Sequence, residues 1–245
     1  MEEIIKVEHV DAGYGKTVVL RDVNFCVKRG EVFVLLGGSG CGKSTMMKHI
    51  IGLNPVLAGS IKIADLEMNR KNKSAIRRKI GVMYQSGALF GSMTVLENVL
   101  LPLEEFSKMK KPERIDKAMY LLESVSMADA ADKMPADLSG GMKKRAAIAR
   151  AMALDPEILF LDEPSAGLDP ITSYALDNLI LKLRDEMKTT FVVVTHELPS
   201  IFTIADRCAM FDKSRKAMIA LGSPKELRDE SEDSFVREFF NRGKF

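Results

Sequence analysis

A glycine-rich segment, GGSGCGKST at residues 37–45, fits the pattern G-x-x-x-x-G-K-[ST]. Glycines let successive backbone N–H groups point into one concavity, and the dipole of a following helix adds positive potential there. The lysine can reach the β- and γ-phosphates of a nucleotide, and the hydroxyl after it can bind Mg²⁺. The alternative, a glycine-rich loop without a ligand, is disfavoured because the apolar run EVFVLL supplies the preceding strand. The predicted nucleotide-binding residues are Gly37, Gly38, Ser39, Gly40, Cys41, Gly42, Lys43, Ser44 and Thr45, with Ser44 also a metal ligand.

Cys41 inside this segment allows two interpretations. A thiol at a helix N-terminus has a lowered pKa and can act as a redox switch. Alternatively, cysteine is simply a small residue that fills a tight loop. We favour the second interpretation, because the other two cysteines, Cys26 and Cys208, are far away in the sequence. The odd number of widely spaced cysteines predicts free thiols in a reducing compartment.

Two acidic side chains follow another apolar run, in ILFLDEP at residues 158–164. In open α/β sheets, ligands bind beyond the carboxyl ends of the strands. Asp162 there can hold Mg²⁺, and Glu163 can orient or deprotonate an attacking water. Phosphoryl transfer needs little more than charge neutralisation and an in-line nucleophile. Adjacent acids after a strand are common, so the prediction depends on their combination with the glycine-rich segment.

Three further side chains are weaker candidates. His196 ends the run TTFVVVTHE and could bond a γ-phosphate, although a capping or core histidine is the alternative. Gln85 follows GVMY, where its amide could bind Mg²⁺ or water, or could belong to an ordinary turn. Tyr14 in GYGKT offers a flat face for an adenine, or is an exposed turn residue. His9 and His49 lack such a context and are expected to be structural.

The segment DLSGGMKKRAAIARAMAL, residues 137–154, predicts a helix with an unusual N-terminus. Ser139 is a good N-cap, and strong helix formers run from Met142 to Leu154. The first turns carry three basic residues, although a helix N-terminus favours acidic ones. The arrangement predicts either an anion site at this helix end or a solvated basic face.

The elements that must position these residues follow from the apolar runs. Continuous runs predict buried strands of a parallel sheet at residues 31–36, 79–84, 157–164 and 189–197. Residues 3–28 predict antiparallel strands, and the C-terminal part, from residue 208, predicts a hairpin and then a helix. The stretch 86–155 predicts a helical subdomain inserted into an α/β core.

The composition is that of a folded protein: 245 residues, 46% hydrophobic and 29% charged. Lys and Arg total 36 against 34 Asp and Glu, so the net charge of +2 gives no nucleic-acid footprint. No apolar run approaches the roughly 20 residues of a membrane span, and the acidic N-terminus is not a secretory signal. A cytosolic chain is expected, which a partner would have to recruit if it works at a membrane.

Taken in order, these motifs resemble the ATP-binding cassette (ABC) ATPases over nearly the whole chain. The resemblance implies a single domain over residues 1–245: a P-loop NTPase core with a mostly parallel sheet, an N-terminal antiparallel β subdomain and the helical insertion. It implies that Gln85 is the Q-loop glutamine, His196 the switch histidine and Tyr14 the adenine-stacking aromatic. It also implies a homodimer with two ATP molecules and Mg²⁺, in which Ser139, Gly140, Gly141 and Asp169 contact ATP held by the partner chain.

Finer features are similar to one subgroup, the Mla- or Mce-associated ATPases of phospholipid transport. Met142 stands where most members have glutamine, and Gly38 where many have proline. The segments 86–103, 204–211 and 234–243 also resemble this subgroup. Import of a small solute, and a regulatory ATPase of the cell-division type, are the alternatives.

The subgroup implies partners at a membrane. They are a transmembrane permease and, with it, an MCE lipid-binding protein and a small STAS-type subunit, at the cytoplasmic face of the inner membrane. The loop SGALFGSM at residues 86–93 is expected either to fold under itself or to receive a permease helix, with Phe90 as the anchor.

Overall fold

The computed structural model describes residues 2–241, which divide into two compact units. One unit comprises residues 2–77 and 190–241, and the other comprises residues 78–189. Each unit is described by itself. None of the helices within residues 2–241 is long and apolar enough to cross a membrane.

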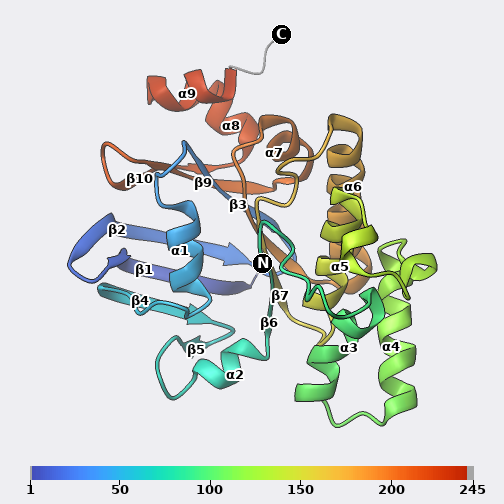
Figure 1. The fold of residues 1–245 in the computed structure, drawn as a ribbon. Helices are drawn as coiled ribbons and strands as arrows, with labels where there is room; N and C mark the ends of the chain where they lie inside the picture. The colour runs from blue at the N-terminus through green and yellow to red at the C-terminus, as the bar shows by residue number, and fades with distance from the viewer. Residues whose placement is uncertain (1, 242–245) are drawn as a thin grey trace. The chain divides into compact units, whose positions relative to one another are not determined.

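The first unit contains an antiparallel sheet in the order β2-β1-β4-β5 (Figure 1). Its strands are β1 (Glu3–Tyr14), β2 (Thr17–Lys28), β4 (Ala58–Ile63) and β5 (Leu66–Glu67). Pairs such as Val7 with Phe25 and Val10 with Val23 set the register of β1 and β2, and these four side chains are buried. The predicted antiparallel strands within residues 3–28 are therefore confirmed.

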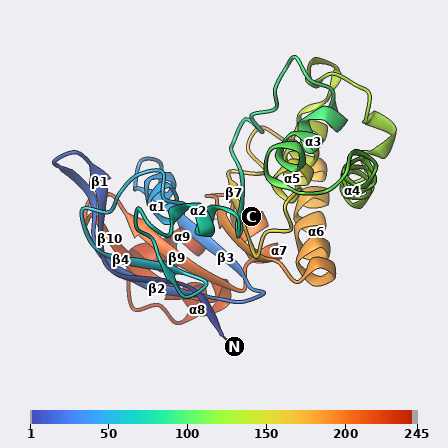
Figure 2. The ribbon, with the colours of Figure 1, turned by 90° about the horizontal axis from the view of Figure 1, so that it is seen from below.

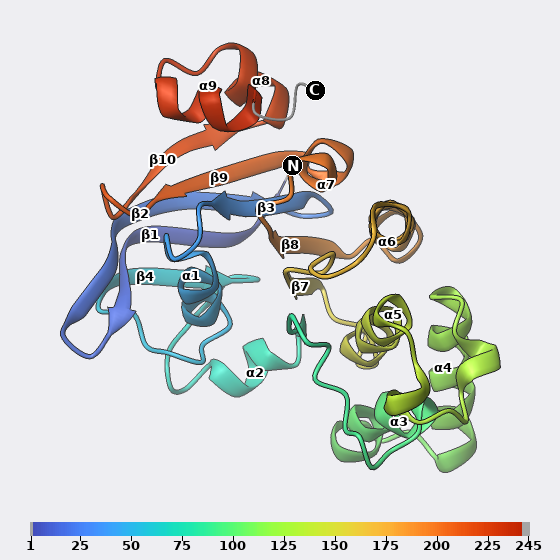
Figure 3. The same cartoon turned by 45° about the horizontal axis from the view of Figure 1, so that its top comes forward.

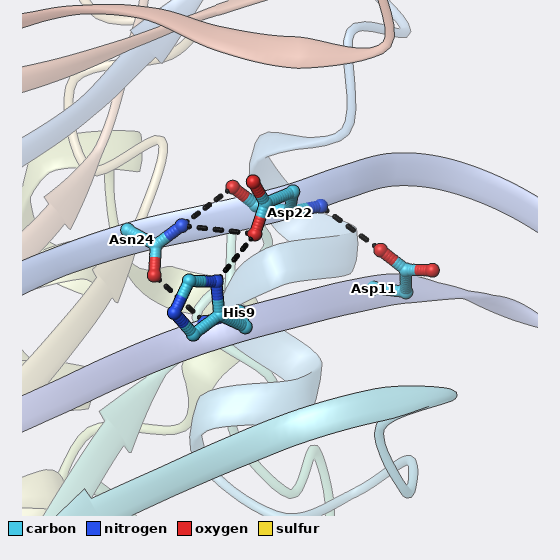
Figure 4. Close-up of polar contacts among 4 residues, drawn as sticks. All are labelled: His9, Asp11, Asp22 and Asn24. Carbon is cyan, nitrogen blue, oxygen red and sulfur yellow. Dashed lines mark hydrogen bonds and ion pairs between the residues drawn. The ribbon is translucent and has the colours of Figure 1, made fainter.

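A cluster of polar side chains fixes an irregularity in this hairpin (Figure 4). His9 and Asp22 adopt φ values of 50° and 47°, where the register of β1 on β2 shifts. The Asn24 side chain accepts from the His9 N–H at 2.8 Å and donates to the Asp22 carbonyl at 2.8 Å, while Asp11 accepts from the Asp22 N–H at 2.9 Å. Hydrogen bonds from His9 and Asn24 lower the pKa of Asp22. His9 thus has a structural role.

The first unit also contains four strands in the order β10-β9-β3-β8 (Figure 3). They are β3 (Val32–Gly37), β8 (Thr190–Val194), β9 (Arg207–Asp212) and β10 (Ala217–Gly222). β3 pairs in parallel with β8 and β9, and β9 pairs with β10 as the predicted hairpin. Every residue of β3 and β8 is buried, as continuous apolar runs predict. β8 is shorter than the predicted 189–197, because the chain leaves the sheet after Val194.

Five helices belong to the first unit. They are α1 (Lys43–Ile50), α2 (Lys73–Arg77), α7 (Leu198–Ile204), α8 (Pro224–Asp229) and α9 (Ser234–Asn241). Ser223 and Glu226 form a capping box at the start of α8, the predicted C-terminal helix. α9 covers most of the closing segment 234–243, of which residues 242 and 243 lie outside the described part.

The second unit contains two strands and four α-helices (Figure 2). β6 (Ile80–Met83) and β7 (Ile158–Asp162) pair in parallel. The helices are α3 (Val95–Phe106), α4 (Lys111–Ser124), α5 (Gly140–Ala151) and α6 (Pro170–Met187), with short 3₁₀ turns at Ala128–Ala130 and Pro135–Asp137. Three of these helices fall within residues 86–155, while the extent of a separate helical subdomain there stays a prediction.

Candidate nucleotide site

The glycine-rich segment joins β3 to α1 and needs glycine at two positions for steric reasons. Gly37 has φ 142°, and a Cβ there would lie 2.3 Å from the Phe211 carbonyl oxygen. Gly42 has φ 110°, and a Cβ there would lie 2.9 Å from a side-chain carbon of Leu20. The loop therefore passes close to its neighbours in a conformation that L side chains rarely adopt.

Lys43 is the first residue of α1, and its side chain turns back onto the loop. The residue is only 8% exposed, and its Nζ donates to the carbonyl oxygens of Gly37 at 2.8 Å and Gly38 at 3.2 Å. α1 has no acidic residue in its first turn and no side-chain cap at Gly42. A positive side chain and a helix N-terminus therefore meet at one loop, which is the electrostatic arrangement that binds phosphate.

The Cys41 side chain fills space inside the loop. It is buried, and a Cβ at Gly37 would lie 2.7 Å from its sulfur. Burial raises the pKa of the Cys41 thiol, although the nearby Lys43 charge opposes this. All three cysteines are free thiols. A protonated, buried thiol is unreactive, which supports the packing interpretation.

Tyr14, at the end of β1, lies beside the same loop. The residue is 48% exposed, and its hydroxyl is 3.3 Å from the Thr45 hydroxyl on α1. Buried His49 fixes this strand end, since its Nε2 accepts from the Gly13 N–H at 3.0 Å while Nδ1 faces the Asn54 carbonyl oxygen at 3.2 Å. Burial lowers the pKa of His49, so the neutral ring is favoured. The sequence indicated a structural histidine but not that it holds the strand of Tyr14.

His196 follows β8 rather than ending it. β3 and β8 run parallel with Leu35 opposite Val194, so the carboxyl ends of both strands lie at one edge of the sheet. The loop after β3 and the exposed His196 therefore leave the sheet at the same edge.

In the second unit, parallel pairing brings the carboxyl ends of β6 and β7 together, with Met83 opposite Leu161. Gln85 comes two residues after β6, Asp162 ends β7, and Glu163 follows with φ 46°. The structure thus gathers the predicted amide and both predicted carboxylates at one strand edge. They are oxygen ligands of the kind Mg²⁺ prefers. Within residues 2–241 no group of three or more His, Cys, Asp or Glu side chains could hold a metal ion.

The N-terminus of α5 has the predicted cap. Ser139 Oγ accepts from the Met142 N–H at 3.3 Å. Gly141 lies against α6, where an added Cβ would be 2.6 Å from Thr172 Cγ2. The Asp169 carboxylate caps α6, accepting from the Thr172 N–H at 3.0 Å and from its hydroxyl at 2.6 Å, and these bonds lower the pKa of Asp169. Thr172, which the sequence did not single out, thus links the two helix ends.

Two of the three basic side chains at this helix end are hydrogen-bonded to backbone carbonyl groups. Lys144 is buried and donates to the carbonyl oxygens of Gln85 and, at 3.2 Å, Glu163. Arg145 donates to the carbonyl oxygens of Val125 at 3.3 Å and Ser126 at 3.0 Å. The predicted contacts of an anion at this end stay Ser139, Gly140 and Gly141.

The loop after Gln85 is exposed yet firmly held. Phe90 is 51% exposed, so it is not folded under the loop. Buried Asn98 accepts from the Phe90 N–H at 2.8 Å and donates to its carbonyl oxygen at 3.1 Å. Arg150 donates to the carbonyl oxygens of Ala88 at 2.7 Å and Gly87 at 2.8 Å. The exposed Phe90 therefore belongs to a loop whose backbone is fixed by these hydrogen bonds.

Comparison with known proteins gives consistent matches. Residues 20–166 match a family model described as ABC transporter. The chain is 36% identical over 242 residues to the intermembrane phospholipid transport system ATP-binding protein MlaF of Escherichia coli, covering 97% of this chain and 88% of that protein. It is 39% identical to the probable ribonucleotide transport ATP-binding protein mkl of Mycobacterium leprae and 36% identical to the methionine import ATP-binding protein MetN of Clostridioides difficile. These matches cover 97% and 91% of this chain, and 68% and 70% of those proteins.

Solved structures agree with the predicted fold. A subunit of the cbiONQ ABC transporter complex of Clostridium perfringens superposes with a TM-score of 0.87 at 30% identity, over 100% of this chain and 96% of that chain. A bacterial ABC transporter cassette in a dimeric structure gives 0.80 at 33% identity, over 90% and 98%. The predicted α/β class is confirmed by these superpositions. The chain spans only about two thirds of the length of its mycobacterial relatives.

Proposed function

The chain belongs to the ABC transporter ATP-binding family, and we propose that its ATPase activity drives phospholipid transport between membranes. Members of the family are ATPases coupled to transport, so this chain is an ATP-hydrolysing subunit. The loop geometry around Lys43 is the observation that carries ATP binding, because a buried ammonium turned onto glycine-loop carbonyls is already placed for phosphate.

In this proposal the first unit binds the nucleotide. The N–H groups of residues 37–45 surround the phosphates, Lys43 contacts the β- and γ-phosphates, and Tyr14 stacks on the adenine. His196 would hydrogen-bond the γ-phosphate from the same edge of the sheet. The exposure of the Tyr14 ring beside Thr45 supports its role.

The second unit supplies the hydrolytic residues. When bound, Mg²⁺ neutralises charge on the phosphates, and Gln85 and Asp162 are its proposed ligands in this unit. Glu163 would accept a proton from the attacking water, or hold that water in line. The gathering of Gln85, Asp162 and Glu163 at one strand edge supports these roles.

The active form is proposed to be a homodimer with two ATP molecules. Ser139, Gly140, Gly141 and Asp169 would contact the ATP bound by the partner chain. Ser139 caps a helix whose first turn contains no acidic residue, and a cassette similar to this chain forms a dimer. ABC ATPases pair with transmembrane permeases, and we place the permease helix at Phe90, which is exposed on a rigid loop.

The phospholipid cargo is the finer part of the proposal. MlaF has the largest share of its own length matched among the three named relatives, 88% against 68% and 70%. Met142 and the segments around Phe90 resemble that subgroup. An MCE protein and a STAS-type subunit are the further proposed partners, at the cytoplasmic face of the inner membrane. Import of a small solute is the second candidate, because MetN is equally similar in identity.

The deciding experiment is purification of the complex from native membranes, followed by identification of co-eluting proteins and bound lipid. Phospholipid in the complex, and lipid transfer by reconstituted vesicles that depends on ATP, are expected. A complex without phospholipid, whose ATPase is stimulated by methionine or another small solute, would contradict the cargo but not the ATPase. Absence of ATP hydrolysis by the assembled complex would contradict the function itself.

A further inference from the structure

Lys144 lies inside the second unit, on the helix that begins with the capping serine. It is 6% exposed, and Lys43 is the only other buried lysine within residues 2–241. Placing an ammonium away from water costs free energy unless hydrogen bonds or charges compensate. Burial accordingly lowers the pKa of Lys144, while the charges of Glu163 and Asp162 oppose that shift. The position must therefore be held by strong contacts.

Those contacts are two backbone carbonyl groups at the proposed hydrolytic edge. Lys144 Nζ donates to the carbonyl oxygen of Gln85, beyond β6, and to that of Glu163, beyond β7, at 3.2 Å. The Glu163 carbonyl oxygen also accepts from the Ala166 N–H at 3.2 Å. One ammonium thus ties α5 to the chain after both strands, and α5 packs on β6.

The backbone of Glu163 needs such support. Its φ of 46° lies in the left-handed region, which non-glycine residues adopt at a cost. Such a conformation persists only where surrounding contacts determine it, and the direction of the Glu163 side chain depends on it. Without the Lys144 bond, the Glu163 carbonyl oxygen would lose the donor that connects it to helix α5.

We propose that Lys144 is a positioning residue, which holds the backbone of Glu163 and Gln85 in the geometry needed for hydrolysis and couples both to helix α5. The inference rests on the proposed ATPase site. In this role Lys144 acts through the two backbone carbonyl groups and is assigned no contact with the nucleotide or the attacking water. Because Gly140 and Lys144 are one helical turn apart, contact of the partner's ATP with the start of α5 is transmitted to the hydrolytic residues of the same chain.

The test compares variants of the assembled transporter. Lys144→Met keeps most of the stem and removes the donors, so kcat is expected to fall about 10- to 100-fold, since small misplacements of reacting groups have effects of this size. The KM for ATP should stay within about twofold, because Lys144 is not proposed to bind nucleotide. Lys144→Arg should retain most of the turnover, and Lys144→Gln should be intermediate.

A matched control is Lys117→Met. Lys117 also ties two elements of the second unit, donating to Asp155 at 2.5 Å, but it touches none of the proposed site residues. It is expected to lower the melting temperature without lowering kcat. An equal loss of turnover in both variants would mean general loosening and would overturn the proposal.

A second readout separates positioning from folding. In a Glu163→Gln background, Lys144→Met should still dimerise with ATP, because binding and the partner contacts are retained. Wild-type turnover in Lys144→Met, or equal loss in the Met and Arg variants when both are folded, would overturn the inference. If Lys144→Met does not fold, the Gln and Arg variants decide by the same criterion. If Glu163→Gln loses turnover but Lys144→Met does not, the role of Lys144 is contradicted while the proposed ATPase site is still supported.

Discussion

Replacing Glu163 by glutamine is the sharpest perturbation of the proposed chemistry. Glutamine has the same length and keeps one acceptor oxygen, but it cannot take a proton from water. The backbone should not change, because the bonds to the Glu163 carbonyl oxygen from Lys144 and Ala166 do not involve the side chain. The substitution therefore removes the base and leaves its position intact.

The expected loss follows from the role assigned. A positioned general base contributes about 10²–10⁴ in rate, or about 3–5 kcal/mol of barrier. A residue that only orients water through its acceptor oxygen would lose about tenfold or less on this substitution, since the amide oxygen remains. A fall of more than about 100-fold would thus assign proton transfer to Glu163.

The assay measures phosphate release in single turnover together with nucleotide affinity. The chain contains no tryptophan, so a fluorescent ATP analogue can be followed without that background. Affinity in Glu163→Gln should stay within about twofold, because binding is assigned elsewhere. Lys43→Ala is the contrasting variant and should lose affinity itself, since its ammonium lies at the loop. Near-wild-type turnover in folded Glu163→Gln would refute the reasoning.

Three other outcomes are expected. ATP should dimerise Glu163→Gln, and Ser139→Arg in that background should prevent it, because arginine would occupy the space of the partner's phosphate; light scattering that shows a dimer for both would contradict the contact in trans. Phe90→Ala should keep the melting temperature, since the ring is exposed, and should weaken co-purification with the permease; unchanged co-purification would remove Phe90 from that contact. Burial lowers the pKa of His49, so its contribution to stability is present above its unfolded pKa of about 6.5 and is lost as pH falls through the lower folded value. Urea unfolding at pH 7.5 and pH 5 should therefore show a smaller loss for His49→Gln than for the wild type, and equal losses would contradict this.

The features that could be predicted from the sequence are those set by local chemistry. The glycines of residues 37–45 indicate a phosphate loop, because its backbone conformation requires glycine. The continuous apolar runs of β3 and β8 indicate strands, because buried strands require apolar residues. Ser139 as an N-cap belongs to the same class, since its oxygen bonds a group three residues away.

The features that could not be predicted depend on contacts between distant parts of the chain. The sequence gives the positive charge of Lys144 and Arg145 but not the groups that they contact, so it did not indicate that both side chains donate to backbone carbonyl groups. The contact of His49 with the strand of Tyr14 and the role of Thr172 were missed for the same reason, although His49 was expected to be structural. His49 accepts a hydrogen bond from the Gly13 N–H, which is 36 residues away in the sequence. The role of Thr172 depends on its contact with Gly141, which exists only because α5 packs on α6. The anion site at Ser139, Gly140 and Gly141 stays a prediction.

The close approach of Gly141 to Thr172 limits which substitutions these two positions can accept together. Alanine at position 141 would place its methyl group 2.6 Å from Thr172 Cγ2, which a packed helix pair cannot accept. Serine at position 172 lacks that methyl group but retains the hydroxyl that bonds Asp169. Alanine at position 141 therefore requires a residue without that methyl group at position 172, such as serine, so substitutions at the two positions are coupled.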